Sequence, residues 1–326
     1  MEVGKRLLGR SGLAIGPLGL GGNVFGWTVG EATAAEILDR FVGEGFDLID
    51  TANVYPYWAP GRLGGESETL LGSWLEQRPK MRPRIFLATK VGFSKDSTSG
   101  GLSRRCLLRE VDQSLRRLHT DYIDLYQSHV DDPSTPLEET LDTYASLIKT
   151  GKVRTIGASN ISAERFGQAL RVSATCGYPR YESLQPEYNL YTRAPFETAL
   201  APLCQTEQIG VIPYFALASG FLTGKYHSES EFLASRRGQF VQAAFNTREM
   251  FQRRGQRVLA TLGTLSAEIH ATPAQISLAW LLAHGVTAPI ASVTSVAQLK
   301  ELIGGARLSL SRESIALLDA SSTSEN

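Results

Sequence analysis

The strongest constraint on the fold is an alternation that runs through most of the chain. Short β-branched and apolar runs, each about five residues long, alternate with longer segments whose apolar residues recur at helical spacing. Strands and helices that alternate in this way form a parallel sheet, because each helix carries the chain back to start the next strand. Eight runs are predicted to be strands: Leu18–Gly21, Asp47–Asp50, Ile85–Lys90, Tyr122–Gln127, Arg154–Ala158, Glu182–Gln185, Gly210–Phe215 and Ala288–Ser292.

The length of 326 residues allows either two average domains or one large closed barrel. Since no linker or shift of composition divides the chain, one domain over residues 1–326 is favoured over a doubly wound sheet split in two. The predicted fold class is α/β, a (β/α)8 TIM barrel. Lys5–Leu8 and Leu13–Ile15 are predicted to form a short N-terminal β-hairpin that plugs one end. Residues 220–247 are predicted to form a long loop after the seventh strand, of the kind that carries function.

Several segments carry residues that typically begin a helix. Thr33–Glu36 reads as a capping box, and Ser103 is a predicted N-cap. Residues 272–275 (Thr-Pro-Ala-Gln) combine an N-cap, a first-turn proline and a capping-box partner. The polar tail Ser321–Asn326 is predicted to be frayed.

The charge balance narrows the class of partner. Lys and Arg number 33, Asp and Glu also 33, and no block of like charges interrupts the chain. A nucleic-acid or membrane-surface protein needs a sustained basic face, so neither partner is expected. A small molecule is the expected partner. Neutral charge permits self-association without indicating it, so the oligomeric state stays open.

Targeting and cysteine usage point to the cytoplasm. The opening residues MEVGKRLLGRSG lack the apolar core of a signal peptide, and the longest apolar stretch, near Leu278–Ala283, is too short to cross a bilayer. Cys106, Cys176 and Cys204 form no C-x-x-C pair. They are therefore predicted to be reduced and buried, and no metal site is expected.

Ionisable residues stand at predicted strand ends, where the active site of a barrel of this kind lies. Asp50 ends the second strand, Lys90 ends the third, His129 follows the fourth, and Tyr55 lies in the loop after the second. Each alone could have an ordinary structural role, but together they suit carbonyl chemistry.

The chemistry follows from how a tyrosine releases a proton. A tyrosine with a pKa of about 10 donates a proton slowly at neutral pH unless a cation stabilises its phenolate, as Lys90 would. A buried carboxylate would keep that lysine charged, and His129 would donate a hydrogen bond to the substrate carbonyl. Since none of these groups supplies a hydride, a nicotinamide cofactor is required.

Six motifs in chain order carry a resemblance to a known family. They are GFDLIDTANVY, IFLATKVG, DYIDLYQSHVDD, GKVRTIGASN, LQPEYNLYTR and YFALASGFLTGKY. With these motifs the chain resembles, over nearly its whole length, the aldo-keto reductases, barrel enzymes that use NAD(P)H. The resemblance implies a bacterial oxidoreductase that reduces an aldehyde or ketone to an alcohol. It also implies a catalytic tetrad of Asp50, Tyr55, Lys90 and His129, with Tyr55 as proton donor.

The resemblance further implies where the cofactor binds. Ser159 and Asn160 match the pair that hydrogen-bonds the nicotinamide carboxamide, Gln185 joins them, and Tyr214 matches an aromatic ring stacked on the nicotinamide. The segment that ends at Lys225 would pass over the pyrophosphate. The implied cofactor-binding residues are Gly22, Ser159, Asn160, Gln185, Tyr214, Phe215, Leu217, Ser219, Gly220, Lys225, Thr294, Gln298 and Glu301.

The adenosine-binding stretch departs from the family pattern. Thr294 and Gln298 fall where the 2′-phosphate is met, and Glu301 where the adenine amino group is met. However, Leu302 replaces an asparagine, Ser292 replaces a glycine, and no arginine lies between residues 292 and 298. A 2′-phosphate prefers a guanidinium group, so the missing arginine argues against a strict preference for NADPH. NADP(H) is favoured, with use of NAD(H) as well. One hypothesis is that an arginine of the long loop, Arg248, Arg253 or Arg254, folds in to compensate.

Substrate residues and competing functions complete the predictions. Aromatic side chains of the first three βα loops are predicted to line the substrate site: Trp27, Tyr57, Trp58 and Phe93. They would favour aryl or extended apolar carbonyls over small polar sugars.

One competing function is a slow redox sensor or regulatory subunit that keeps the barrel and cofactor. Another is a lysine aldolase with a Schiff base at Lys90.

Overall fold

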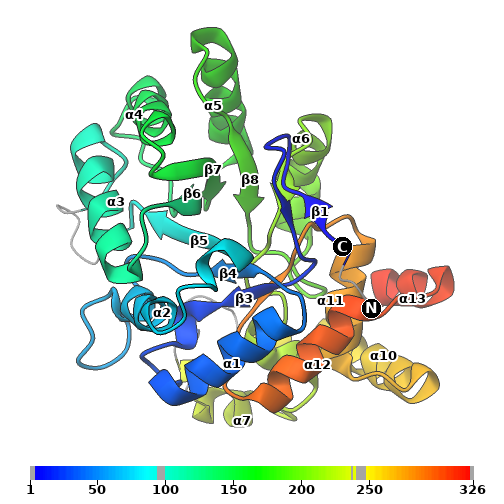
Figure 1. Cartoon of the computed structure of the whole chain (residues 1–326). Helices are drawn as coiled ribbons and strands as arrows, with labels where there is room; N and C mark the ends of the chain where they lie inside the picture. The colour runs from blue at the N-terminus through cyan, green and yellow to red at the C-terminus, as the bar shows by residue number, and fades with distance from the viewer. Residues whose placement is uncertain (1–3, 94–99, 236–237, 240–246, 324–326) are drawn as a thin grey trace.

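The computed structural model describes residues 4–93, 100–235, 238–239 and 247–323, and in it helices surround a central set of parallel strands (Figure 1). The strands follow the spatial order β10-β3-β4-β5-β6-β7-β8-β9. Their bounds are β3 (Gly19–Gly21), β4 (Leu48–Asp50), β5 (Phe86–Val91), β6 (Ile123–Ser128), β7 (Val153–Ser159), β8 (Tyr181–Gln185), β9 (Gly210–Val211) and β10 (Ile290–Ala291).

The first and last strands of this order meet and close the sheet. The backbone N–H of Ile290 donates to the carbonyl of Pro213 at 2.9 Å. The predicted (β/α)8 barrel is confirmed. The predictions for its last two strands were too long, since the structure keeps only two residues each of 210–215 and 288–292. Pro213 has no N–H to extend the ladder, and Phe215 leaves the extended region with φ 52°.

A short antiparallel hairpin covers the amino-terminal end of the barrel, as predicted. It consists of β1 (Arg6–Leu7) and β2 (Ala14–Ile15). Asp47, at the start of the second barrel strand, anchors it by accepting a hydrogen bond from Gly16 N at 2.7 Å and pairing with Lys5 Nζ at 2.9 Å. The apolar cluster inside the barrel includes two hairpin residues and comprises Leu8, Ile15, Leu48, Phe86, Ala88, Leu125, Ile212, Ala288 and Ile290.

Two of the predicted helix starts are confirmed. The Ser103 hydroxyl accepts a hydrogen bond from Cys106 N, and Thr272 with Gln275 forms a reciprocal capping box. The barrel helices are α1 (Glu31–Gly43), α2 (Glu66–Glu76), α3 (Arg104–Leu118), α4 (Leu137–Lys149), α5 (Ala163–Cys176), α6 (Ala201–Thr206), α10 (Arg253–Ile269), α11 (Pro273–Ala283), α12 (Val296–Arg307) and α13 (Arg312–Ser322). Short helical turns are η1 (Gly22–Val24), η2 (Arg82–Arg84) and η3 (Phe196–Leu200).

The capping box predicted at Thr33–Glu36 was wrong. The helix begins at Glu31, and its N-cap is Gly30, which has extended backbone and no side chain to cap with. Glu31 lies in the first turn, where the partial positive charge of the helix N-terminus stabilises a carboxylate. The helix therefore starts before the Thr33 side chain can act as a cap.

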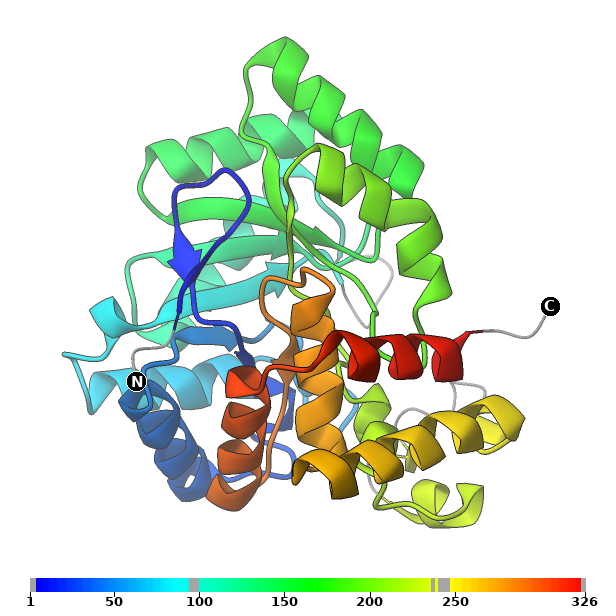
Figure 2. The ribbon, with the colours of Figure 1, turned by 90° about the vertical axis from the view of Figure 1, so that its right-hand side faces the viewer.

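The segment after the seventh barrel strand is partly helical and not one unbroken loop. It contains η4 (Ala218–Thr223), α7 (Glu229–Ala234) and α9 (Thr247–Met250), while residues 236–237 and 240–246 lie outside the described residues. Next in the chain is α10, which lies beside α13 on the outside of the barrel (Figure 2).

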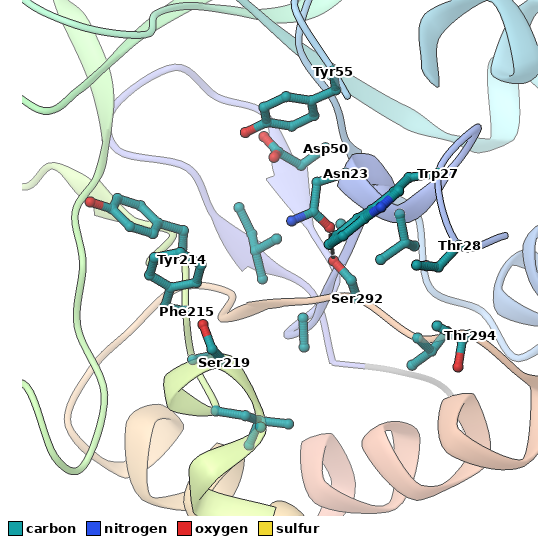
Figure 3. Close-up of a pocket in the computed structure, with 18 of the residues that line it drawn as sticks. Asn23, Trp27, Thr28, Asp50, Tyr55, Tyr214, Phe215, Ser219, Ser292 and Thr294 are labelled. Carbon is teal, nitrogen blue, oxygen red and sulfur yellow. Dashed lines mark hydrogen bonds between the residues drawn. The ribbon is translucent and has the colours of Figure 1, made fainter. Parts of the chain in front are cut away.

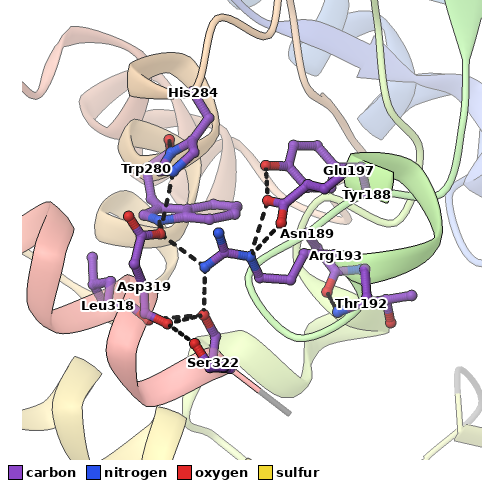
Figure 4. Close-up of polar contacts among 12 residues, drawn as sticks. Tyr188, Asn189, Thr192, Arg193, Glu197, Trp280, His284, Leu318, Asp319 and Ser322 are labelled. Atoms are coloured by element: carbon purple, nitrogen blue, oxygen red, sulfur yellow. Dashed lines mark hydrogen bonds and ion pairs between the residues drawn. The ribbon is translucent and has the colours of Figure 1, made fainter. Parts of the chain in front are cut away.

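The prediction of a frayed tail was wrong for its first two residues. Ser321 and Ser322 belong to α13 and are buried. The Ser322 hydroxyl accepts a hydrogen bond from Arg193 Nη1 at 2.8 Å, and Arg193 also pairs with Asp319 (Figure 4). This contact to the loop before α6 holds the helix end in place; residues 324–326 lie outside the described residues.

Two further observations bear on the predictions. Cys106 and Cys204 are buried, but Cys176, the last residue of α5, is exposed. The prediction that all three cysteines are buried was therefore wrong for Cys176. No described helix combines the length and hydrophobicity needed to cross a bilayer.

Candidate active site

A cavity of about 830 Å³ opens where the barrel strands end (Figure 3). It brings together every predicted site residue except Lys90 and Gly22. Lys90 lies fully buried beneath Tyr55, and a Cβ at Gly22 would lie 2.9 Å from Ser67 Oγ, so that face is packed. The predicted residues that line the cavity are Trp27, Asp50, Tyr55, Tyr57, Trp58, Phe93, His129, Ser159, Asn160, Gln185, Tyr214, Phe215, Leu217, Ser219, Gly220, Lys225, Thr294, Gln298 and Glu301.

A chain of polar contacts connects three of the four predicted catalytic residues. Lys90 Nζ donates to Asp50 Oδ2 at 2.5 Å, to the Thr51 carbonyl at 2.8 Å and to Tyr55 Oη at 3.3 Å. Asp50 is in register with Ala88 on the neighbouring strand, which brings Lys90, two residues further along, to the same end of the barrel. Because side chains alternate along a strand, Asp50 and Lys90 both point inward.

The charge of Lys90 is set by these neighbours. Burial lowers the pKa of Lys90, but attraction to Asp50 and then to Tyr55 outweighs it, so the net pKa is raised above its ordinary value. The ammonium therefore stays charged. An aldolase needs a neutral, accessible lysine amine to form a Schiff base, and Lys90 is neither neutral nor accessible.

His129 lies beside Tyr55, with 5.7 Å between the two ring centroids. Burial, and secondarily the charge of Lys90, lowers the pKa of His129 to about 3. Its Nδ1 is buried and has no hydrogen-bond partner among the described residues. The imidazole is thus neutral at physiological pH, and a neutral imidazole can donate one hydrogen bond without carrying charge.

Two amides that hold the second oxygen of Asp50 form a further part of this site. Gln127 Nε2 donates to Asp50 Oδ1 at 3.0 Å, and Gln185 Nε2 donates to the same oxygen at 2.9 Å. Sequence reasoning missed Gln127, although its place two residues before His129 at the end of a strand was an available signal.

The predicted carboxamide-binding pair is linked to the same end of the barrel. Asn160 Nδ2 donates to the His129 carbonyl at 2.9 Å and to Ser159 Oγ at 3.0 Å. Asn160 Oδ1 accepts from Tyr214 Oη at 3.0 Å. Burial, with a smaller contribution from Glu187, raises the pKa of Tyr214, so its phenol stays protonated. These bonds fix the orientation of the Asn160 amide and the Tyr214 ring.

The turn η4 faces the cavity with strained backbone and an unsatisfied hydroxyl. Ser219 and Gly220 have φ angles of 57° and 94°, the left-handed region. Ser219 Oγ is buried against the cavity and has no partner among the described residues, and the same holds for Thr28 Oγ1 on the opposite loop. Such hydroxyls fit a polar ligand, since a buried donor left without a partner is costly. Lys225, which also lines the cavity, adds a positive charge.

The predicted adenosine-binding residues lie together at the far end of the cavity. Gln298 Oε1 accepts from Thr294 N at 2.8 Å and from Thr294 Oγ1 at 3.2 Å, and Glu301 follows on α12. Sequence reasoning did not assign Asn23, whose Oδ1 accepts from Ser292 Oγ at 2.6 Å in the cavity wall. Ser292 directly follows β10 and Asn23 lies two residues after the end of β3, which was an available signal.

The structure does not bring two of the three candidate compensating arginines to the cavity. Arg254 donates from Nη1 to the Tyr191 carbonyl at 3.0 Å and lies 4.0 Å from the Tyr191 ring centroid, so cation–π packing holds it away from the cavity. Arg253 is exposed on α10 and does not line the cavity. The side chain of Arg248 lies outside the described residues.

Aromatic rings surround Tyr55 in a continuous set of edge-to-face and tilted contacts. Trp58 contacts Trp27, Tyr55 and Tyr57, with ring centroids 5.3 to 6.0 Å apart. Phe93 lies 5.2 Å from Tyr57 and closes the set against His129. We call these four predicted substrate residues, Trp27, Tyr57, Trp58 and Phe93, the aromatic wall. No group of side chains suited to a metal ion occurs among the described residues.

Comparison with known proteins agrees with this arrangement. Residues 17–323 match the family model described as "Aldo/keto reductase family". The chain is 31% identical to the Bacillus subtilis protein named "Uncharacterized oxidoreductase YrpG", over 96% of this chain and 94% of that protein. It is 35% identical to the Bacillus subtilis "Aldo-keto reductase YhdN", over 68% and 63%. It is 31% identical to the Schizosaccharomyces pombe "Putative voltage-gated potassium channel subunit beta", over 86% and 81%.

Proposed function

Because the chain belongs to the aldo/keto reductase family of NAD(P)H-dependent oxidoreductases, we propose that it reduces an aldehyde or ketone to an alcohol with NADPH. Membership implies a small carbonyl compound as substrate. The observation that carries the finer proposal is the chain of contacts from Asp50 through Lys90 to Tyr55. It provides a proton donor whose conjugate base meets a fixed positive charge.

In this proposal Tyr55 gives its proton to the carbonyl oxygen of the substrate. The phenolate that remains lies 3.3 Å from the Lys90 ammonium, which stabilises it. Asp50 and the Thr51 carbonyl keep that ammonium charged and aimed. The neutral His129 donates a hydrogen bond to the same carbonyl oxygen, which polarises the C=O bond without placing a second cation beside Lys90.

The cavity residues suit a nicotinamide dinucleotide, which supplies the hydride when bound. Ser159, Asn160 and Gln185 would hold the carboxamide, and Tyr214 would cover the ring. Gly22 is not among these residues, because its free face packs against Ser67 and Phe25 and not against the cavity. Phe215, Leu217, Ser219, Gly220 and Lys225 would surround the pyrophosphate, and Thr294, Gln298 and Glu301 would meet the adenosine end. The orphaned Ser219 and Thr28 hydroxyls support a polar ligand here.

A preference for NADPH over NADH is part of the proposal, but a modest one. Lys225 is the one lysine or arginine that lines the cavity among the described residues. A lysine is a weaker partner for a phosphate than the guanidinium fork of arginine. We therefore expect both nicotinamides to support turnover, with NADPH giving the higher kcat/KM.

The aromatic wall favours aryl or extended apolar carbonyl compounds. Apolar surface buried against these rings contributes about 25 cal/mol per Å², and ring contacts add to it. Free sugars cannot use this surface and would leave hydroxyl groups facing it. Equal catalytic efficiency on benzaldehyde-type compounds and free sugars would contradict this preference.

A panel of aldehydes, ketones, quinones and keto-sugars, each assayed with NADPH and with NADH, tests the proposal. Loss of nicotinamide absorbance that depends on both carbonyl and protein is the expected result. The same panel with Tyr55→Phe is the matched control. If no carbonyl in the panel is turned over, the reductase proposal fails.

A second candidate rests on one relative. The fission-yeast protein named as a potassium channel β subunit raises the proposal of a redox sensor that binds the nicotinamide and turns over slowly. Tight cofactor binding without turnover on any carbonyl would favour it over the reductase.

A further inference from the structure

The carboxylate of Asp50 is held from two sides, and only one side is explained by proton transfer. Oδ2 meets the Lys90 ammonium, whereas Oδ1 accepts from both Gln127 Nε2 and Gln185 Nε2. Gln185 Nε2 also lies 3.2 Å from Gln127 Oε1. Three hydrogen bonds thus join the two amides to each other and to one carboxylate oxygen inside the barrel.

The orientation of both amides is dictated by Asp50. An ionised carboxylate can only accept hydrogen bonds, so each glutamine must turn its nitrogen toward it. With its nitrogen toward Asp50, Gln127 presents its oxygen to the second N–H of Gln185. The arrangement therefore has a single consistent set of donors and acceptors.

Gln127 differs from Gln185 in its access to the cavity. Gln127 is fully buried and does not line the cavity, whereas Gln185 does. Lys90, on the neighbouring strand β5, is the register partner of Gln127. Gln127 therefore reaches the Lys90 ammonium and Tyr55 through Asp50, and it reaches the cavity wall through its contact with Gln185. This is the position of a residue that acts through others.

We propose that Gln127 is a positioning residue for proton transfer, whose amide prevents Asp50 from drawing the Lys90 ammonium away from Tyr55. This inference rests on the proposed reductase function. It deepens that function by adding a residue behind the carboxylate to the proton donor and its cation.

The physical reason lies in how the negative charge of Asp50 is shared. With two amide donors on Oδ1, part of the charge is stabilised away from Lys90. Without Gln127, Oδ1 keeps one donor, and the carboxylate attracts the ammonium more strongly. Lys90 then stabilises the Tyr55 phenolate less, so the tyrosine releases its proton at a higher pH.

The test is a spectrophotometric titration of the tyrosine at 295 nm in Gln127→Met, which keeps a linear side chain but removes the amide. The Tyr55 signal is the difference between each protein and the same protein carrying Tyr55→Phe. We expect the midpoint to move up by about 0.5–1 pH unit. The matched control is Leu125→Met, since Leu125 lies two residues earlier on the same strand and packs in the barrel interior. This substitution should leave the titration midpoint of Tyr55 unchanged.

Turnover gives a second readout. In Gln127→Met the high-pH limb of kcat should move in the same direction, and kcat at neutral pH should fall about three- to tenfold with KM nearly unchanged. In an Asp50→Asn background, the same substitution should add no further shift, since the carboxylate is gone. If Gln127→Met does not fold, Gln127→Leu replaces it.

An unchanged titration midpoint in the folded variant overturns the inference, as does an equal shift with and without Asp50. The titration needs no substrate, so it remains valid if the protein reduces no carbonyl. The carbonyl panel therefore tests the proposed function, and the titration tests the role of Gln127 independently of it.

Discussion

His129 is expected to make the protein sensitive to acid, and its surroundings give the size of the effect. Burial, then the charge of Lys90, lowers its pKa from 6.5 to about 3. Below pH 6.5 the unfolded chain takes up a proton here that the folded chain does not, so stability falls as the pH falls, until it levels off near pH 3. The slope is about 1.4 kcal/mol per pH unit, and from pH 6.5 to 4.5 the loss amounts to about 2 kcal/mol.

The assay is urea denaturation of the protein and of His129→Gln at pH 6.5, 5.5 and 4.5. Comparing the two proteins cancels the contribution of the carboxylates, which titrate over the same range in both. The free energy of unfolding of the unsubstituted protein should fall by about 2 kcal/mol more than that of His129→Gln. His227→Gln removes an exposed imidazole and should reproduce the unsubstituted protein. Parallel curves for the protein and His129→Gln would refute a buried, neutral histidine.

Three further substitutions have defined outcomes. Tyr55→Phe should lower carbonyl reduction at least about 100-fold, with cofactor affinity by fluorescence titration within about threefold; substantial residual turnover would rule out Tyr55 as the acid. Arg254→Gln should lower the free energy of unfolding by about 1–2 kcal/mol, because the contacts of Arg254 with Tyr191 are lost. If the variant also binds NADPH more weakly, Arg254 contributes to the cofactor site after all. Gly21→Ala would place a Cβ 2.5 Å from Ser292 Oγ and should weaken cofactor binding about tenfold, which Ser292→Gly in the same chain should reverse.

Features encoded locally were predictable. The alternation of strand and helix patterns identified the barrel, and the caps at Ser103 and Thr272 are formed by residues a few positions apart. The strand-end rule brought Asp50 and His129 to one cavity, because parallel strands all end on the same side. The errors at Thr33 and Ser321 have different causes. Thr33 was a possible cap, but the helix already begins at Glu31, directly after Gly30. Ser321 and Ser322 resemble a polar tail, but Ser322 contacts Arg193, which lies 129 residues away in the chain.

By itself, the sequence determined the order of strands and helices and which chemical groups stand near the strand ends, since these follow from periodicity along the chain. Only the tertiary structure decided which groups meet. Gln127 and Gln185 lie 77 and 135 residues from Asp50, and barrel closure places both amides on one carboxylate oxygen. Arg254 contacts Tyr191 and not the cavity for the same reason. A hydrogen-bond partner is chosen by distance and direction in the closed barrel, which no pattern within one strand or helix encodes.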